Sequence, residues 1–262
     1  VTDEVFRKVF DRLAEIEAKM TINEKNRESE IIALNEAAGK AFVTLSPDTF
    51  YVLEKAVEFA KLSGGKFDVT IGPLVKLWNI GEEGERVPEP GEIEEALRRV
   101  GYQHIILDKE NSRAKLELPG MAVDLGGIAK GYAADEAARI LREEGVEHAI
   151  VNLGGNVITL NTKPDGSRYR IGLQEPFAPT GEYMAIVHIE DESFVSSGIY
   201  ERYFEQDGKI YHHLLNPQTG YPEDNALTSV TIITGVSIDA DALSTATFLM
   251  GLEKGLQFIE AL

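Results

Sequence analysis

The chain has 262 residues, of which 43% are hydrophobic and 27% are charged, the composition of a globular protein with a substantial core. The formal net charge of −18 excludes a basic surface of the kind that tracks the phosphates of nucleic acid. There is no cysteine, so thiolate catalysis, disulfides and zinc–sulfur sites are excluded. A phosphorylated ligand must therefore be attracted locally, by metal ions, backbone amides or a few basic residues.

The first half of the chain is predicted to be rich in helices. Thr2 is expected to cap a helix with an apolar stripe that faces the core. The stripe consists of Val5, Phe6, Val9, Phe10, Leu13, Ile16 and Met20. Ser46-Pro47-Asp48 is a start signal for a second helix that reaches Ser63. Later helices are expected over residues 90–100 and 128–144, each ended by a glycine.

The second half of the chain is predicted to be rich in strands. Strand patterns occupy residues 148–153, 169–173, 184–189, 211–215 and 227–234. Asp207-Gly208 predicts a hairpin turn, and residues 240–251 a last helix. Helices that precede strands without a βαβ repeat indicate the α+β class, with mixed, largely antiparallel sheets and packed helices. We expect one domain over residues 1–262, helix-rich in its first half and strand-rich in its second.

The glycine-rich run of residues 123–135 is the most unusual segment. A short apolar strand is expected to meet Gly126-Gly127, which opens a helix. The unpaired amides at a helix N-terminus suit a phosphate, and Lys130 can add a cation. The run lacks the spacing of a Walker loop and of the dinucleotide-binding motif. It indicates either a phosphate site or a plain tight turn between strand and helix.

Residues 237–245 offer oxygen ligands at short spacing. On a helix, Asp241 and Thr245 lie one turn apart on the same face. A carboxylate and a hydroxyl in that arrangement can share a hard cation such as Mg²⁺, which keeps waters for a substrate phosphate. The alternative is an N-capped helix with acidic residues in its first turn.

Two histidines end a predicted strand. Adjacent strand residues face opposite sides, so only one of His212 and His213 can face a given site. A neutral histidine there is a candidate for accepting a hydroxyl proton, or it is merely structural. Ser196-Ser197-Gly198 is ambiguous between a turn and a backbone anion site. Residues 64–74 indicate a helix exit into a short strand, which can present an aromatic and an acid to a ligand ring.

Taken together and in chain order, these segments resemble the ApbE family of FAD:protein FMN transferases. The likeness spans nearly the whole chain. The matching runs are Ser29-Glu30-Ile31 with Leu34-Asn35, residues 63–74, residues 124–135, residues 151–155, Ser196-Ser197-Gly198 with Tyr200, Arg202, Tyr203 and Phe204, residues 213–220 and residues 240–245.

The resemblance implies roles for individual residues. Asp241 and Thr245 are expected to bind Mg²⁺ through their side chains, and Gly127 through its backbone carbonyl. His213 matches the residue that acts as the catalytic base. The residues expected in the FAD pocket are Asp124, Lys130, Lys66, Phe67, Asp68 and, near the flavin, Asn23, where many members carry an aromatic.

The function that the resemblance implies is Mg²⁺-dependent cleavage of FAD. FMN is transferred through a phosphoester to a Thr or Ser hydroxyl of an acceptor flavoprotein subunit of a redox complex, and AMP is released. The same motifs fit two alternatives, an FAD pyrophosphatase that yields FMN and AMP, and an FAD-binding protein without turnover. The resemblance also implies a periplasmic lipoprotein, held at the membrane only by a lipid anchor, whose leader and first strand are absent from this sequence.

Overall fold

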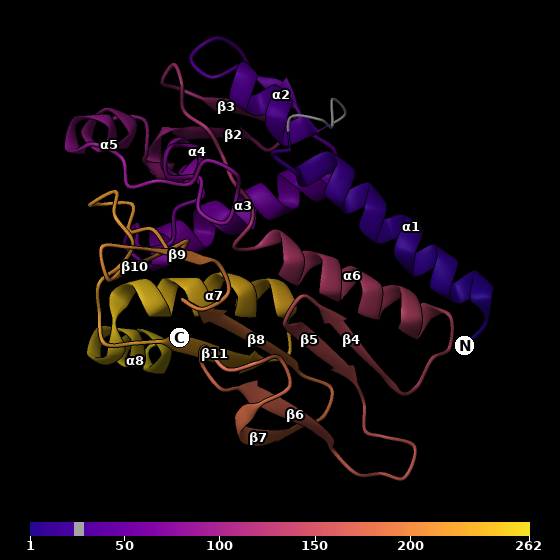
Figure 1. Ribbon diagram of the computed structural model, residues 1–262. Coiled ribbons are helices and arrows are strands. Elements are labelled where there is room, and N and C mark those ends of the chain that lie inside the picture. Colours follow the sequence, from indigo (N-terminus) through magenta and orange to yellow (C-terminus); the bar gives the residue numbers. More distant parts are fainter. Residues whose placement is uncertain (24–28) are drawn as a thin grey trace.

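The computed structural model describes residues 1–23 and 29–262 (Figure 1). The helices are α1 (Asp3–Met20), α2 (Glu30–Glu36), α3 (Pro47–Leu62), α4 (Gly72–Trp78), α5 (Pro90–Leu97), α6 (Ala129–Glu143), α7 (Ser237–Met250) and α8 (Leu252–Glu260). The strands are β1 (Val43–Thr44), β2 (Ile105–Asp108), β3 (Arg113–Leu116), β4 (Ala149–Leu153), β5 (Asn156–Leu160), β6 (Tyr169–Gln174), β7 (Tyr183–Ile189), β8 (Ser193–Gly198), β9 (Tyr203–Gln206), β10 (Lys209–His212) and β11 (Ser229–Thr234).

The central sheet has the strand order β11-β8-β5-β4, and every neighbouring pair is antiparallel. Helices α6 and α7 lie along one face of this sheet, and the hairpin β6–β7 lies on its other side (Figure 1). In that second layer Val157 and Phe194 of the sheet pack against Ile171 and Ile189 of the hairpin. The predicted α+β class with largely antiparallel sheets is confirmed.

Strand β5 was not predicted from the sequence because it is covered on both faces. All of its residues are buried, so its side chains do not alternate between apolar and polar. The predicted strands near residues 148–153, 169–173, 184–189 and 227–234 are present as β4, β6, β7 and β11. The strand expected over residues 211–215 ends at His212, and beyond it Leu215 forms only an isolated bridge with Pro222.

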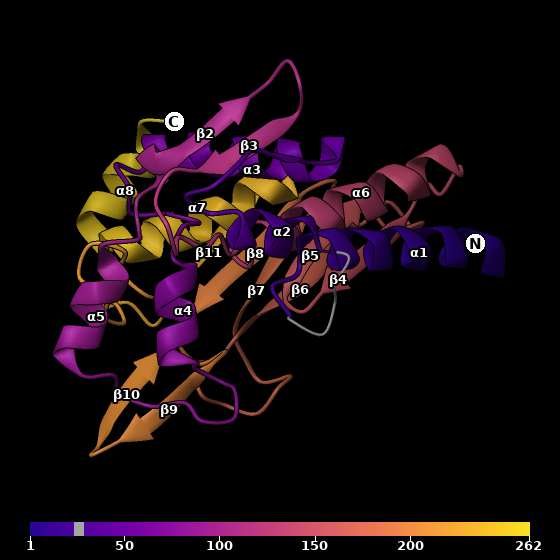
Figure 2. The same cartoon turned by 90° about the horizontal axis from the view of Figure 1, so that it is seen from above.

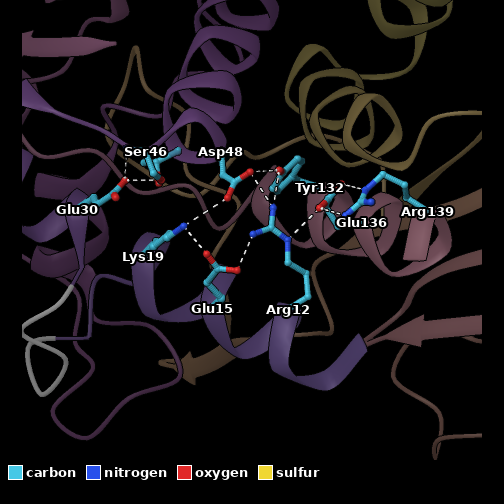
Figure 3. A network of polar contacts seen from close by, with 10 residues as sticks. Arg12, Glu15, Lys19, Glu30, Ser46, Asp48, Tyr132, Glu136 and Arg139 are labelled. Atoms are coloured by element: carbon cyan, nitrogen blue, oxygen red, sulfur yellow. Dashed lines mark hydrogen bonds and ion pairs between the residues drawn. The ribbon is translucent and has the colours of Figure 1, made fainter. Parts of the chain in front are cut away.

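Helix α1 packs against α6 and is joined to α3 and α6 by a polar network (Figure 3). Arg12 donates hydrogen bonds to Asp48 at 2.7 Å and to Glu136 at 2.9 Å, and the hydroxyl of Tyr132 donates to Asp48 at 2.7 Å. Burial of Val5, Val9, Ile16 and Met20 confirms most of the predicted core stripe. The same prediction is wrong for the two phenylalanines, because only a narrow side of α1 meets α6.

Phe6 and Phe10, which were expected in the core, are 50% and 65% exposed.

Two further expectations fail in the segments that precede α4 and α6. Residues 64–74 enter helix α4 and form no strand. The expected strand before Gly126 is irregular backbone, with one parallel bridge between Ile71 and Ala122. The two segments meet too closely for side chains, since a Cβ on Gly72 would lie 2.6 Å from the carbonyl oxygen of Ala122.

Two smaller sheets complete the fold. The sheet β1-β3-β2 packs with α2 and α3 over a large apolar cluster that also contains residues of α6 and α7. The hairpin β9–β10 lies beside α4 at one end of the molecule (Figure 2). There Trp78 is fully buried, lies 5.6 Å from the ring of Tyr211, and donates its indole N–H to the carbonyl oxygen of Gly220. This cluster fixes the loop that carries His213.

Candidate active site

The N-terminal ends of α6 and α7 lie side by side and exchange hydrogen bonds. The Asp241 carboxylate of α7 accepts from the backbone N–H of Gly131 in α6, at 2.8 Å. In return, the Asp135 carboxylate of α6 accepts from the N–H groups of Ser237 and Ile238, both at 2.8 Å. A glycine is needed at residue 131, because a Cβ there would lie 2.3 Å from the carbonyl oxygen of Ser237.

The three predicted metal ligands are oxygen donors from these two helix ends. Asp241 and Thr245 both lie on α7, one turn apart, as predicted. A Cβ placed on Gly127 would lie 3.7 Å from Thr245 Oγ1 and 3.3 Å from the Phe67 ring, so the backbone before α6 is close to the Thr245 hydroxyl. A carboxylate, a hydroxyl and a carbonyl form the donor set that Mg²⁺ prefers.

The candidate cation site has few acidic side chains for a metal site. Within residues 1–23 and 29–262, no three His, Asp or Glu side chains gather as metal ligands. Burial raises the pKa of the Asp241 carboxyl, and the charge of Lys130 opposes this shift. A buried carboxylate with one backbone donor is stabilised by a cation, and a site with one carboxylate leaves positions for a substrate's phosphate oxygens. The residues present therefore fit Mg²⁺.

Asn156 was not singled out from the sequence, and it lies beside the candidate ligand. Its side chain is buried, and the amide lowers the pKa of Asp241. No hydrogen bond of ordinary geometry joins the two, and Nδ2 of Asn156 has no partner. The amide is therefore a neighbour of the carboxylate and not a hydrogen-bonded support.

The two histidines differ in burial, and His213 lies just beyond the end of β10. His212 is buried, with Nε2 3.0 Å from the carbonyl oxygen of Glu223, and is structural. His213 is partly exposed and has Nδ1 3.2 Å from the carbonyl oxygen of Arg202. Because a carbonyl only accepts, Nδ1 must carry the proton, and the lone pair of the neutral ring is on Nε2.

The surroundings keep His213 neutral. Burial, followed by the positive charge of Arg202, lowers the pKa of His213 to about 3. Lys130 acts in the same direction, and it also lowers the pKa of Asp241. Its ammonium is thus in electrostatic reach of both groups, and Lys130 follows Gly127 by three residues. One region of the molecule therefore contains the candidate base and the candidate metal ligands.

Two cations and two further acids belong to the same region. Neither Lys130 nor Arg202 has an ion-pair partner in the described part of the chain, and both are exposed. Burial raises the pKa of Glu201, and Lys130 and Arg202 oppose that shift. Burial also raises the pKa of Asp124, whose carboxylate accepts from the N–H of Gly126 at 2.8 Å. Glu201 and Arg202 had no role assigned from the sequence, although Arg202 belongs to the matching run.

The segment Lys66-Phe67-Asp68 has mainly structural contacts. Asp68 accepts hydrogen bonds from the N–H and hydroxyl of Thr70, at 2.8 and 2.6 Å, and from the N–H of Tyr102, at 2.9 Å. The Phe67 ring is buried beside Gly127, and Lys66 lies 4.0 Å from Glu223. The segment therefore shapes the wall of the site, and Asp68 secures that wall to the loop before β2.

A groove of about 350 Å³ leads away from this region between α1 and the start of α6. Its lining is mainly apolar, with side chains such as Leu13, Ile16 and Met20, and its charged lining residues are Glu17, Asp124 and Lys130. Ile22 also lines it, whereas Asn23 is exposed at the next position and donates its N–H to Thr21 Oγ1 at 3.0 Å. An apolar groove with charged groups in its lining suits a flat ring attached to a phosphate.

Comparisons with known proteins identify the family. The sequence pattern of the ApbE family matches residues 1–262. A Klebsiella pneumoniae protein named FAD:protein FMN transferase is 43% identical over 95% of this chain and 76% of its own length. One of the same name from Treponema pallidum is 38% identical over 90% of this chain and 69% of its own length.

Solved structures show the same fold. The flavin transferase ApbE from Vibrio cholerae superimposes with a TM-score of 0.89 at 30% identity, over 100% of this chain and 82% of that one. The ApbE protein from Thermotoga maritima gives a TM-score of 0.87 at 35% identity, over 94% and 79%. The match to the family pattern and the agreement in fold lead to one conclusion: the chain belongs to the ApbE family.

Proposed function

We propose that this chain is an FAD:protein FMN transferase, which joins FMN to a Thr or Ser hydroxyl of an acceptor flavoprotein and releases AMP. The names of its relatives supply the reaction class. The observation that carries the proposal for this chain is electrostatic. Lys130 acts on both His213 and Asp241, so an imidazole base and an oxygen-only cation site share one region with cations that have no ion-pair partner among the described residues.

Asp241, Thr245 and the carbonyl of Gly127 are the residues that hold Mg²⁺ in this proposal. The ion supplies positive charge that neutralises the diphosphate and the departing phosphate. Lys130 and Arg202 complement it, because their positive charges attract an anion to a protein whose net charge is −18. The apolar groove between α1 and α6 receives the flavin ring, with its phosphate end at Asp124 and Lys130.

His213 acts as the general base. The carbonyl of Arg202 fixes the proton on Nδ1, so Nε2 accepts the proton of the acceptor hydroxyl. The hydroxyl oxygen then forms a bond to the phosphorus on the FMN side. The bond from that phosphorus to the bridging oxygen breaks, and AMP leaves with the electron pair. The products are a phosphoester-linked flavoprotein and AMP.

A single assay tests the proposal. The protein is incubated with FAD, Mg²⁺ and a candidate acceptor, and the denatured acceptor is analysed by mass spectrometry. We expect an FMN adduct on a Thr or Ser in the wild type, and a loss of the adduct in Asp241→Ala and His213→Ala. FMN in solution without an adduct indicates the pyrophosphatase, and unchanged FAD indicates a binding protein. Either result contradicts the proposal.

The location outside the cytoplasm, the lipid anchor and the membership of the acceptor in a redox complex stay predictions. Within the described residues, none of the helices has the length and apolar character that a bilayer crossing requires.

A further inference from the structure

Three hydroxyl groups form a line behind the candidate cation site. Thr245 Oγ1 lies 3.1 Å from Ser197 Oγ, which lies 2.8 Å from Ser244 Oγ. Ser244 Oγ in turn donates to the backbone carbonyl oxygen of Asp241, at 2.9 Å. Ser244 is fully buried and Ser197 is 7% exposed, so water does not compete for these groups. The line therefore begins at one candidate ligand and returns to the backbone of the other.

The direction of every hydrogen bond in this line follows from counting protons. A carbonyl only accepts, so the single proton of Ser244 is used on the carbonyl of Asp241. Ser244 must then accept from Ser197, which uses the single proton of Ser197. Ser197 must therefore accept from Thr245. The Thr245 hydroxyl donates into the protein, and its lone pairs are left for the other side.

A hydroxyl binds a hard cation through a lone pair, and its proton must point elsewhere. Gly127 lies next to the Thr245 hydroxyl, since a Cβ there would lie 3.7 Å from Oγ1. We propose that Ser197 and Ser244 are positioning residues that hold the proton of Thr245 inward, so that its lone pairs face Mg²⁺. The inference rests on the proposed function, because it takes Thr245 as a ligand of that ion.

The first test is Ser197→Ala, measured as Mg²⁺ affinity by calorimetric titration of the full chain with Mg²⁺ alone. Without Ser197 the Thr245 proton has no fixed acceptor, and partners of metal ligands typically contribute about 10–100-fold to affinity. We expect Mg²⁺ binding to weaken by about 10-fold. The unfolding temperature without Mg²⁺ separates this effect from a loss of stability.

Ser196→Ala is the matched control. Ser196 is the neighbouring residue of β8 and faces the opposite side of the strand, where its hydroxyl lies 2.8 Å from that of Thr231. The control breaks a similar hydroxyl–hydroxyl contact on the same strand, and the Mg²⁺ affinity of Ser196→Ala should stay within about 2-fold of the wild-type value. Ser197→Thr keeps a hydroxyl acceptor and should restore most of the affinity. Equal weakening in Ser196→Ala and Ser197→Ala overturns the inference.

Ser244→Ala removes the hydroxyl that α7 contributes to this series of hydrogen bonds. Without Ser244, the Ser197 hydroxyl can donate its proton to Thr245 and occupy a lone pair of the Thr245 oxygen, so Mg²⁺ binding should also weaken. This variant serves if Ser197→Ala does not fold.

Asp241→Ala distinguishes a failure of the positioning role from a failure of the metal site. If it abolishes Mg²⁺ binding while both serine variants bind normally, only the positioning role is wrong. If Asp241→Ala binds Mg²⁺ normally, the metal site and the proposed function fail as well.

Discussion

The carboxylate of Asp241 in α7 accepts a hydrogen bond from the backbone N–H of Gly131, 2.8 Å away in the first turn of α6. Asp241 is thus both a candidate cation ligand and a contact between two helices. Burial raises the pKa of Asp241, and the hydrogen bond from the Gly131 N–H opposes that rise. The ligand is therefore oriented before any cation binds.

The first prediction concerns the approach of these helices. In Gly131→Ala the new methyl would lie 2.3 Å from the carbonyl oxygen of Ser237, so α6 and α7 must separate. We expect a loss of about 1–3 kcal/mol in the free energy of unfolding, measured by urea denaturation, together with weaker Mg²⁺ binding. Gly91→Ala is the control, because nothing lies within 4 Å of its added methyl. A fully stable Gly131→Ala variant would contradict the close packing.

The second prediction is a pH dependence of stability. The hydrogen bond from Arg12 is the main cause that lowers the pKa of Asp48 to about 2, below the value of about 3.9 in an unfolded chain (Figure 3). A depressed carboxyl pKa contributes stability that is present above the unfolded pKa and is lost as the pH falls through the folded one. Asp48→Asn should therefore cost about 1 kcal/mol at pH 7, after allowance for solvent screening.

This cost should shrink as the pH falls from about 4 to about 2, and denaturant melts at several pH values measure it. Asp11→Asn changes the net charge equally at an exposed position of α1 and should leave stability within about 0.5 kcal/mol. If the two variants behave alike at every pH, the network with Arg12 has no stabilising role.

The sequence predicts the elements that have strong local signals. Pro47 and the glycines after residue 62 mark α3 correctly, the helical spacing marks α1, and Gly145 marks the end of α6. β5 escapes prediction because its burial on both faces comes from tertiary packing, with helix α6 on one face and the β6–β7 hairpin on the other. Phe6 and Phe10 show the same limit, since spacing identifies an apolar face but not how much of it a neighbour covers.

The residues of the candidate site also divide into those that have a local sequence signal and those that have none. Each candidate is singled out from a short stretch of sequence. Asp241 and Thr245 are selected by their helical spacing, and His213, which alternation cannot separate from His212, is selected by its resemblance to the family motif. The partnership of Ser197 with Ser244 spans 47 positions, and that of Gly131 with Asp241 spans 110. No local pattern encodes such pairs. Asp68 was expected in the FAD pocket, but three hydrogen bonds in the folded chain give it a structural role.

The third prediction concerns the base. His213→Gln should bind FAD as the wild type does but lose at least about 100-fold in transfer rate, the contribution typical of a general base. Binding is measured by equilibrium dialysis and transfer by flavin fluorescence of the denatured acceptor. The neighbouring His212→Gln changes stability and not the chemistry, since His212 is buried and bonded to a backbone carbonyl. Undiminished transfer in His213→Gln would exclude it as the base.

The fourth prediction is the pH profile of that reaction. Burial, and then the charge of Arg202, holds the pKa of His213 at about 3, so in the free protein the imidazole keeps its lone pair at all pH values above that. The kcat/KM of transfer should therefore show no fall centred near pH 6.5, the ordinary histidine pKa. In Arg202→Gln a positive charge is lost, and any acid limb should move to higher pH. A wild-type limb near pH 6.5 would contradict this environment.

The last prediction tests the groove as the flavin site. Ala133 lies on α6 and lines the groove, whereas Ala14 of α1 faces solvent. Ala133→Trp places a ring in a volume of about 350 Å³ that a flavin ring must share. We expect FAD affinity to fall by at least about 10-fold, or about 1.4 kcal/mol, while the affinity for Mg²⁺ is retained because Ala133 is not one of the oxygen donors. Ala14→Trp adds the same ring on the outer side of α1 and should bind FAD normally. If Ala133→Trp binds FAD as tightly as Ala14→Trp does, the flavin ring occupies another surface, and the orientation of FAD along Asp124 and Lys130 must be reversed.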